Sequence, residues 1–387
     1  MIKLKRNADR RVRRGHLWIF SNEIESPPVA QLEPGAVHEV RDATGEFVGM
    51  AYVNPQSLIT ARILSRRKIP IDRSFLETRI HTAVEFRRRM FPYGAPCRLI
   101  FSESDLLPGL IVDRYAEYLA VQSHTAGMDS LLPGVLEILH EAMSPAGIYL
   151  RNDSPIRELE GTALEKRLVS GSVPARVTIR SHGLKFLVDI QEGQKTGFFL
   201  DQEANRDLMG KYAFSGARVL DLFCYTGAWG IHAAATGASE VVAVDSSRGA
   251  LHIAESNSEI NGAASRFYTV REQAVDFLKK TDESWDLIVA DPPAFIKSRS
   301  KVNEGRKGYI DLNRRAMGRL KVGGILVTCS CSRHLSFEDF EEVIRTASHQ
   351  AGKRMRILET RGQGPDHPVL LSMPETRYLK VIVAQAI

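Results

Sequence analysis

The chain has 387 residues, 43% of them hydrophobic and 25% charged, which is the composition of a globular protein with two or three domains. No apolar run reaches the ~18 residues of a membrane span, and the basic start lacks the apolar block of a secretory signal. The chain has four cysteines and no CxxC or HxxxH spacing, which argues against a disulfide framework and against a metal site. The net charge is +6, and the basic excess lies in residues 1–100, which carry 18 Lys and Arg against 10 Asp and Glu, whereas the remaining 287 residues carry 34 against 36. We therefore expect a cytoplasmic protein with a polyanionic partner, most simply RNA or DNA.

The first 72 residues predict a small all-β domain. Short stretches rich in β-formers cover 17–24, 36–42, 46–54 and 58–65, and Gly, Asn and Pro separate them. A turn is predicted in DATGEF, between the second and third stretches.

Residues 73–182 predict a central α+β domain. A helix is expected over 73–90 from its apolar spacing, strands over 98–122 around a Pro-Gly turn, and a second helix over 130–143. Basic residues cluster just before and within the first helix and form either an RNA-binding surface or ordinary solvated faces. They are Arg66, Arg67, Lys68, Arg87, Arg88 and Arg89.

From about residue 217 the pattern becomes regular. Strands are predicted at 218–223, 240–245, 266–271, 285–291 and 323–329, and helices at 228–236, 248–260, 273–280, 308–320 and 336–350. Near-continuous apolar strands that alternate with helices predict a doubly wound parallel sheet. Two late strands, 353–360 and 376–386, are expected to pair antiparallel at one edge.

Ligands bind such sheets beyond the carboxyl ends of the strands. The loop after the first strand has Tyr225 where a dinucleotide site has its first glycine, so we expect the tight pyrophosphate turn to be compromised, although Gly227 and Gly230 allow close approach. Asp245 ends the second strand and can accept hydrogen bonds from ribose, and Asp221 can tolerate a sulfonium. An adenosine site without a phosphate cradle favours S-adenosylmethionine over NAD.

The fourth and fifth strands end in residues suited to chemistry on a base. Asp291-Pro292-Pro293 holds an extended backbone whose carboxylate can face an exocyclic amine, with Phe295 available to stack on the ring. Cys329 and Cys331 end the neighbouring strand.

A thiolate at this place can add to carbon 6 of a pyrimidine and so make carbon 5 nucleophilic. Arg333 and His334 follow the two cysteines as candidate cations that favour the thiolate. We expect one of the two cysteines to be catalytic and the other to be a small apolar residue of the core.

These residues resemble the PUA-linked class I methyltransferases that make 5-methylcytosine in large-subunit (23S) ribosomal RNA. The resemblance spans the chain and is clearest in RGHLWIF at 14–20, LPGLIVDRY at 107–115 and EGQKTGFFLDQEANR at 192–206. It implies a PUA-like RNA-binding domain over 1–72, a central domain over 73–182, and a Rossmann-like methyltransferase domain over 183–387. The implied cofactor-binding residues are Lys195, Thr196, Gly197, Phe198, Asp201, Gln202, Arg206, Asp221, Phe223, Tyr225, Gly227, Asp245, Ser246, Asp291 and Pro292, with Gln273 in place of the family's usual third-strand acid.

The resemblance also implies the catalytic residues. The family's fifth-strand motif is Ser-Cys-Ser, which residues 330–332 fit, so Cys331 is the implied nucleophile and Asp291 orients the cytosine. Related enzymes have Thr-Cys-Ser, which residues 328–330 fit, so Cys329 remains a candidate. The second cysteine of the related fourth-strand motif is missing, which leaves open the group that removes the carbon 5 proton. In a separate departure, Ala294 stands where relatives often have Lys.

The expected function is therefore methylation of cytosine carbon 5 in large-subunit RNA through a covalent adduct. Two alternatives remain: a methyltransferase that acts on another base atom without covalent catalysis, and a non-catalytic RNA-binding factor of ribosome assembly. The resemblance allows a homodimer, which nothing in the sequence decides.

Overall fold

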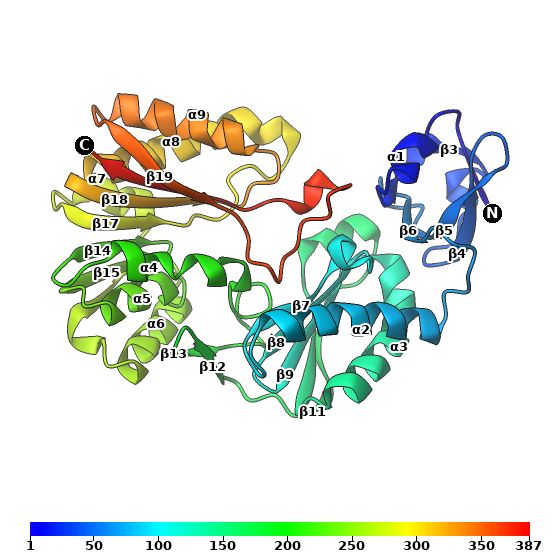
Figure 1. Ribbon diagram of the computed structural model, residues 1–387, viewed down its shortest axis with the longest axis horizontal. Helices are drawn as coiled ribbons and strands as arrows, with labels where there is room; N and C mark the ends of the chain where they lie inside the picture. Colours follow the sequence, from blue (N-terminus) through cyan, green and yellow to red (C-terminus); the bar gives the residue numbers. More distant parts are fainter. The chain divides into compact units, whose positions relative to one another are not determined.

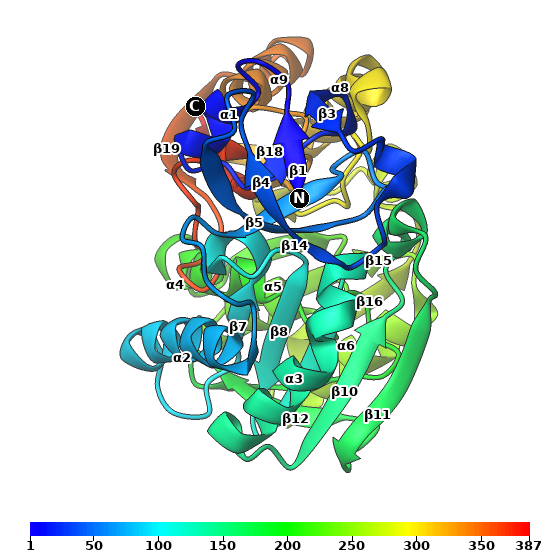
Figure 2. The ribbon, with the colours of Figure 1, turned by 90° about the vertical axis from the view of Figure 1, so that its right-hand side faces the viewer.

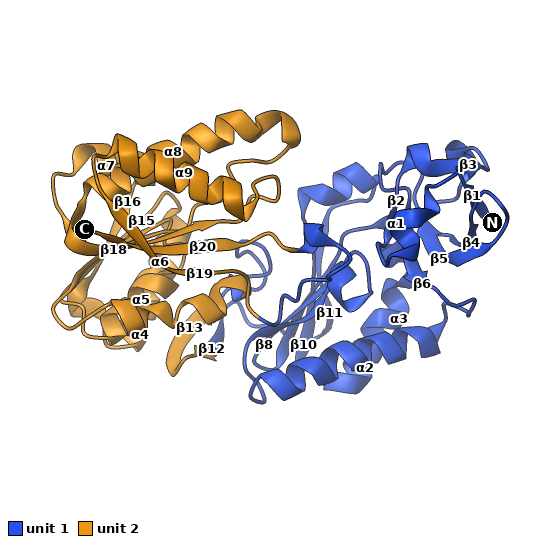
Figure 3. Ribbon diagram, turned by 45° about the horizontal axis from the view of Figure 1, so that its top comes forward, with its two compact units in different colours: residues 1–179, 188–200, 365–376 blue, residues 180–187, 201–364, 377–387 orange.

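The computed structural model describes residues 1–387, which divide into two compact units (Figure 3). The first unit comprises residues 1–179, 188–200 and 365–376, and the second comprises 180–187, 201–364 and 377–387. The domain boundaries at 72 and 182 stay predictions. The segments 188–200 and 365–376, which the sequence assigned to the methyltransferase domain, both group with the N-terminal unit.

A six-stranded sheet forms the beginning of the first unit, in the order β2-β6-β5-β4-β1-β3. Its strands are β1 (Ile2–Leu4), β2 (Trp18–Ile19), β3 (Ile24–Ser26), β4 (Val37–Arg41), β5 (Phe47–Val53) and β6 (Ala61–Ser65), and the short helix α1 (Asp9–Arg13) accompanies them. The predicted β character of this part is confirmed. Apolar strand residues fill its core together with Met373, which comes from the segment 365–376.

A five-stranded sheet forms the rest of the first unit, in the order β11-β10-β9-β8-β7. The strands are β7 (Cys97–Phe101), β8 (Leu110–Tyr115), β9 (Tyr118–Ser123), β10 (Gly147–Asn152) and β11 (Glu165–Gly171). The helices α2 (Arg73–Met90) and α3 (Ala126–Met143) pack on one face of this sheet (Figure 2). The helix predicted over 73–90 is confirmed, and it starts where the Asp72 carboxylate accepts a hydrogen bond from the Phe75 amide.

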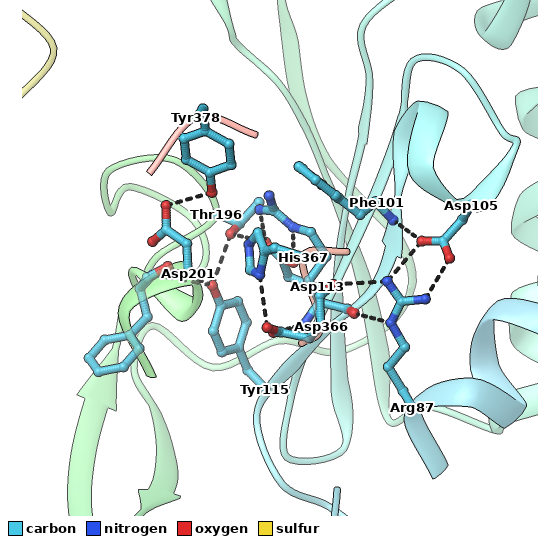
Figure 4. Close-up of polar contacts among 12 residues, drawn as sticks. Arg87, Phe101, Asp105, Asp113, Tyr115, Thr196, Asp201, Asp366, His367 and Tyr378 are labelled. Carbon is cyan, nitrogen blue, oxygen red and sulfur yellow. Dashed lines mark hydrogen bonds and ion pairs between the residues drawn. The ribbon is translucent and has the colours of Figure 1, made fainter. Parts of the chain in front are cut away.

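Arg87 is not on the surface, contrary to both readings of the basic cluster. Its side chain is fully buried, and its guanidinium donates to both carboxylate oxygens of Asp105 at 2.6 and 2.8 Å and to the Asp366 carbonyl at 2.8 Å (Figure 4). A buried guanidinium with a carboxylate partner is a structural link and not a site for RNA. The other five basic residues of the cluster are exposed.

The second unit is built on a seven-stranded sheet in the order β16-β15-β14-β17-β18-β20-β19. Its strands are β14 (Arg218–Leu222), β15 (Glu240–Asp245), β16 (Phe267–Arg271), β17 (Trp285–Ala290), β18 (Leu320–Ser330), β19 (Met355–Arg361) and β20 (Lys380–Ala386). The first five are parallel, and β20 pairs antiparallel with both β18 and β19, so the predicted sheet and its antiparallel edge are confirmed. The strands β12 (Val177–Ser181) and β13 (Leu184–Val188) form a separate two-stranded sheet.

Helices cover both faces of the seven-stranded sheet (Figure 1). One face carries α4 (Leu208–Tyr212), α5 (Ala228–Ala235) and α6 (Arg248–Ile260), and the other carries α7 (Ala274–Lys280), α8 (Val302–Gly318) and α9 (Phe337–Gln350). The predicted start of α8 at 308 is wrong, since the helix begins at Val302. The polar first turn that the prediction missed lies close under the loop after β17. A Cβ at Gly305 would lie only 2.3 Å from Ile296 Cγ1.

None of the helices combines the length and the hydropathy that crossing a bilayer would need.

Candidate functional site

Predicted site residues lie at the carboxyl ends of neighbouring strands. Leu222, Ala290 and Thr328 pair side by side across β14, β17 and β18, and the chain leaves β14 and β17 just after these positions. The strand order reverses between β14 and β17. Asp291 and Cys331 therefore emerge at the switch point, where doubly wound sheets bind their ligands.

The loop between β14 and α5 keeps its tight turn. Tyr225 adopts a φ of 50°, the left-handed conformation for which glycine is normally required, so the expectation of a compromised turn is wrong. Phe223 (φ 61°) and Gly227 (φ 80°) are left-handed as well. Such backbone strain in residues other than glycine costs on the order of 1 kcal/mol or more each and concentrates at functional sites.

The two glycines of this loop allow α5 to pack closely on the sheet. A Cβ at Gly227 would lie 2.9 Å from Phe267 Cζ, and one at Gly230 would lie 2.8 Å from Val241 Cγ1. Any side chain at these positions would push the helix away from β15 and β16, so the loop owes its position to both glycines.

Asp221 is a buried carboxyl group at the bottom of the site. Its Oδ2 accepts a hydrogen bond from the Gly230 amide at 2.8 Å, whereas its Oδ1 has no hydrogen-bond partner. Burial raises the pKa of Asp221 to about 8, and the nearby carboxylates Asp291 and Asp245 act in the same direction. The buried Thr226 hydroxyl also has no partner. Unpaired acceptors among several carboxyl groups fit a ligand that brings donors and positive charge, as S-adenosylmethionine does.

Asp245 lies at the end of β15 and shapes the loops on either side. Its Oδ2 accepts from the Tyr225 amide at 2.9 Å, and its Oδ1 accepts from the Ser247 amide at 2.8 Å. The carboxylate is thereby fixed, and each oxygen keeps a second lone pair for a ribose hydroxyl.

Asp291 is held by two neutral donors. Its Oδ2 accepts from Gln202 Nε2 at 3.0 Å and from Trp229 Nε1 at 3.2 Å, and Asn205 in turn donates to Gln202 Oε1 at 2.8 Å. Sequence reasoning missed Trp229, whose only signal is its place between Gly227 and Gly230. These donors orient the Asp291 carboxylate.

Cys331 differs from the other three cysteines in its exposure. Cys97, Cys224 and Cys329 are buried, and burial raises the pKa of each of these thiols. Cys331 is partly exposed, and its Sγ lies 3.9 Å from the carbonyl oxygen of Pro292. The thiol therefore sits directly beside the Asp-Pro-Pro segment at the end of β17.

The serines on either side of Cys331 are anchored by Tyr309 of α8. Ser330 Oγ donates to the Tyr309 hydroxyl at 3.0 Å, Ser332 Oγ lies 3.0 Å from the same hydroxyl, and the Ile296 amide donates to Ser332 Oγ at 3.1 Å. Phe295 packs on the Tyr309 ring at 4.6 Å between centroids. Sequence reasoning missed Tyr309, which fixes the backbone on both sides of the thiol.

Lys195, Thr196, Gly197 and Phe198 belong to the first unit and are described within it. Thr196 is fully buried, donates to Asp113 Oδ2 at 2.5 Å and lies 2.9 Å from the Tyr115 hydroxyl (Figure 4). These contacts attach the segment 194–199 to β8.

The remaining predicted residues lie in the second unit. Asp201 is buried and accepts from the Tyr378 hydroxyl at 2.7 Å, and Arg206 pairs with Glu203 at 2.8 Å. Pro292 is buried, whereas Ser246 and Gln273 are exposed after β15 and β16. Roles for these residues in cofactor binding stay predictions.

A hollow of about 260 Å³ lies between the last turns of α7, α8 and α9, at the opposite edge of the sheet. Lys279, Arg314, Arg315 and Arg319 line it, but each pairs with an aspartate. Cations at helix C-termini are favoured by the helix dipole, so the hollow needs no ligand to explain it.

Comparisons with known proteins agree with this architecture. Residues 2–66 match the PUA-like domain family, and residues 160–368 match the S-adenosylmethionine-dependent methyltransferase family. The chain is similar to a ribosomal RNA large subunit methyltransferase I of Erwinia tasmaniensis, with 34% identity over 392 residues that cover 99% of this chain and 98% of the relative. The protein of the same name from Shewanella denitrificans is 36% identical over 392 residues, with coverage of 99% and 98%.

Two solved structures share the fold at 20% identity and cover 100% of both chains. One is described as an S-adenosylmethionine-dependent methyltransferase from Streptococcus mutans, with a TM-score of 0.85, and the other, in complex with S-adenosylhomocysteine, is described as a methyltransferase, with a TM-score of 0.86. The predicted fold class and the predicted cofactor, S-adenosylmethionine, are confirmed. The chain belongs to the S-adenosylmethionine-dependent methyltransferases, in the family of the ribosomal RNA large subunit methyltransferase I.

Proposed function

We propose that this protein methylates carbon 5 of a cytosine in large-subunit ribosomal RNA, with Cys331 as the covalent nucleophile. The names of the relatives support the RNA substrate. The observation that carries the chemistry is the partly exposed Cys331 thiol beside the Asp291-Pro292 segment, in a chain whose other thiols are all buried.

The reaction needs few groups. The Cys331 thiolate adds to carbon 6 of the cytosine, the 5,6 double bond opens, and the electron pair moves to carbon 5. Bound S-adenosylmethionine supplies the methyl group as an electrophile. Loss of the carbon 5 proton to a base then re-forms the double bond and expels Cys331. The Asp291 carboxylate, fixed by Gln202 and Trp229, accepts a hydrogen bond from the exocyclic amine and so orients the ring.

RNA binding would fall to the N-terminal half of the chain. The PUA-like domain at 2–66 and the exposed Arg66, Arg67 and Lys68 provide positive charge for the phosphate backbone. The target base must leave its stack to reach a thiol at the end of a sheet. Binding should therefore weaken steeply with salt, because neutralised phosphates release counterions.

Methyl transfer from labelled S-adenosylmethionine to unmodified large-subunit RNA, followed by digestion to nucleosides, tests this function. We expect the label in 5-methylcytidine. Label in another nucleoside would show that the protein uses S-adenosylmethionine but methylates a different base atom. RNA binding without methyl transfer would show a non-catalytic assembly factor.

Replacing Asp245 with alanine should weaken binding of S-adenosylhomocysteine by about 1–3 kcal/mol, because ribose hydroxyls would lose their acceptor. Calorimetric titration measures this affinity. Asp245→Asn is the matched control, since it keeps the shape and one acceptor and should lose less. Unchanged affinity in Asp245→Ala would show that the ribose does not bind at the end of β15.

A further inference from the structure

Lys380 is a buried cation close to the candidate nucleophile. It opens β20, where it pairs with Ser330 of β18, and only 4% of its surface is exposed. Its ammonium donates to the carbonyl oxygen of Ser332 at 2.6 Å and to that of Tyr378 at 2.7 Å. The positive charge is therefore held against the backbone of the residue that follows Cys331.

The charge of Lys380 has no carboxylate partner. Among the other buried cations, Arg87 pairs with Asp105 and Arg206 pairs with Glu203, whereas Arg114, like Lys380, donates to a carbonyl and has no ion pair with a carboxylate. Two carbonyl dipoles compensate only part of the cost of burying an ammonium, and buried charges are normally paired. An anion at this place would complete the pair.

We propose that the Lys380 ammonium is the counter-ion that stabilises the Cys331 thiolate, which makes Lys380 a positioning residue for the nucleophile. This inference rests on the proposed function, because it gives the thiolate of that reaction its cation. Burial lowers the pKa of Lys380 to about 8, and the charge on Cys331 acts in the opposite direction. The ammonium therefore remains mostly protonated at neutral pH. The electrostatic interaction between Lys380 and Cys331 is reciprocal, so an ammonium that the thiolate stabilises also stabilises the thiolate.

Three titratable groups of the second unit that lie near Cys331 bring no positive charge: Asp291, Tyr309 and Cys329. Asp291, directly after β17, is a carboxyl group and cannot supply a positive charge. On α8 and β18, burial raises the pKa of the Tyr309 hydroxyl and of the Cys329 thiol, so both are neutral. Arg333 and His334, which the sequence suggested as the activating cations, are exposed, and solvent and salt screen their charge.

The pH dependence of Cys331 alkylation tests the pair without any methyl transfer. Iodoacetamide reacts with the thiolate, and peptide mass spectrometry follows Cys331 alone, in protein without RNA or cofactor. The variants are Lys380→Gln, which keeps donors for the two carbonyls and removes the charge, and Lys380→Arg, which keeps the charge. Lys321→Gln is the matched control, since Lys321 lies at the start of β18 and pairs with Asp286.

We expect wild type to show a midpoint below the value of about 8.5 for an ordinary cysteine. Lys380→Gln should raise that midpoint by about 1–3 pH units, and Lys380→Arg and Lys321→Gln should leave it in place. Equal midpoints in Lys380→Gln and wild type would overturn the inference. If Lys380→Gln does not fold, the wild-type midpoint decides, because a value at or above about 8.5 contradicts a stabilised thiolate.

Failure of this inference and failure of the proposed function give different results. If Cys331→Ala loses transfer while the alkylation midpoint does not depend on Lys380, the proposed function stands without its counter-ion. If Cys331→Ala keeps transfer while the midpoint depends on Lys380, the ion pair exists but serves another purpose.

Discussion

Replacing Cys331 with alanine is expected to lower methyl transfer to ribosomal RNA by at least about a thousandfold. Removal of a covalent nucleophile leaves only the binding and orientation that the rest of the site provides, and such losses are typically of this size or larger. Affinity for S-adenosylhomocysteine should stay near wild type, because removal of one thiol leaves the Asp245 carboxylate and its hydrogen bonds to the Tyr225 and Ser247 amides in place. Single-turnover transfer and calorimetric titration on the same preparation measure the two quantities.

Cys329→Ala is the control for this experiment. Cys329 is fully buried in β18, with Val381 of β20 opposite, and its buried thiol is protonated at neutral pH. Its loss should leave a small cavity at a cost of about 1 kcal/mol in stability, with activity largely retained. Transfer that survives in Cys331→Ala would indicate attack on another base atom without a covalent intermediate. Transfer lost only in Cys329→Ala would assign the nucleophile to the Thr-Cys-Ser pattern.

The sequence was informative wherever one pattern governs many residues. Apolar runs alternating with helical stretches predicted the parallel sheet, and the rule that ligands bind at the strand ends placed Asp221, Asp245, Asp291 and Cys331 at one edge. The antiparallel pair β19–β20 also followed from local pattern, since two strands joined by a loop tend to be neighbours.

Contacts between distant parts of the chain were not predictable in the same way. Trp229 reaches Asp291 across 62 residues, and Tyr309 reaches Ser330 across 21. The local sequence around either aromatic residue does not predict its hydrogen-bond partner, because the contact exists only after the sheet has assembled. The helix α8 was also difficult to predict from local sequence, because it contains Gly305 and Gly308, and glycine disfavours a helix. In the structure, both glycines allow α8 to pack closely beneath Phe295 and Ile296.

Predictions from the local sequence also failed for two residues that lie in an environment unusual for their type. Tyr225 takes a conformation normally left to glycine, because the Asp245 carboxylate binds its amide. Arg87 belongs to a basic run that reads as solvated. Its spacing nevertheless places it on the apolar stripe of α2 behind Ile80 and Val84, and that periodicity is the signal that identifies it as buried.

Replacing Arg87 with methionine is expected to destabilise the first unit by about 3–5 kcal/mol. The change would leave the Asp105 carboxylate without its cation, and the carbonyls of Arg98 and Asp366 without the donors that they now have at 2.9 and 2.8 Å (Figure 4). Because Asp366 lies in the segment 365–376, protection of this segment should fall together with that of β7. Urea unfolding gives the free energy, and hydrogen exchange measured peptide by peptide locates the loss.

Arg88→Met is the matched control, because Arg88 is exposed on the same helix and pairs only with the exposed Glu85 and a carbonyl. Its effect on stability should stay within about 0.5 kcal/mol. Adding Asp105→Asn to Arg87→Met should restore part of the lost stability, since the double variant no longer buries an unpaired charge while the amide oxygen can still accept from the Phe101 amide. Equal stability of the two arginine variants would contradict the structural role of Arg87 and would indicate that it behaves like the exposed basic residues of the cluster.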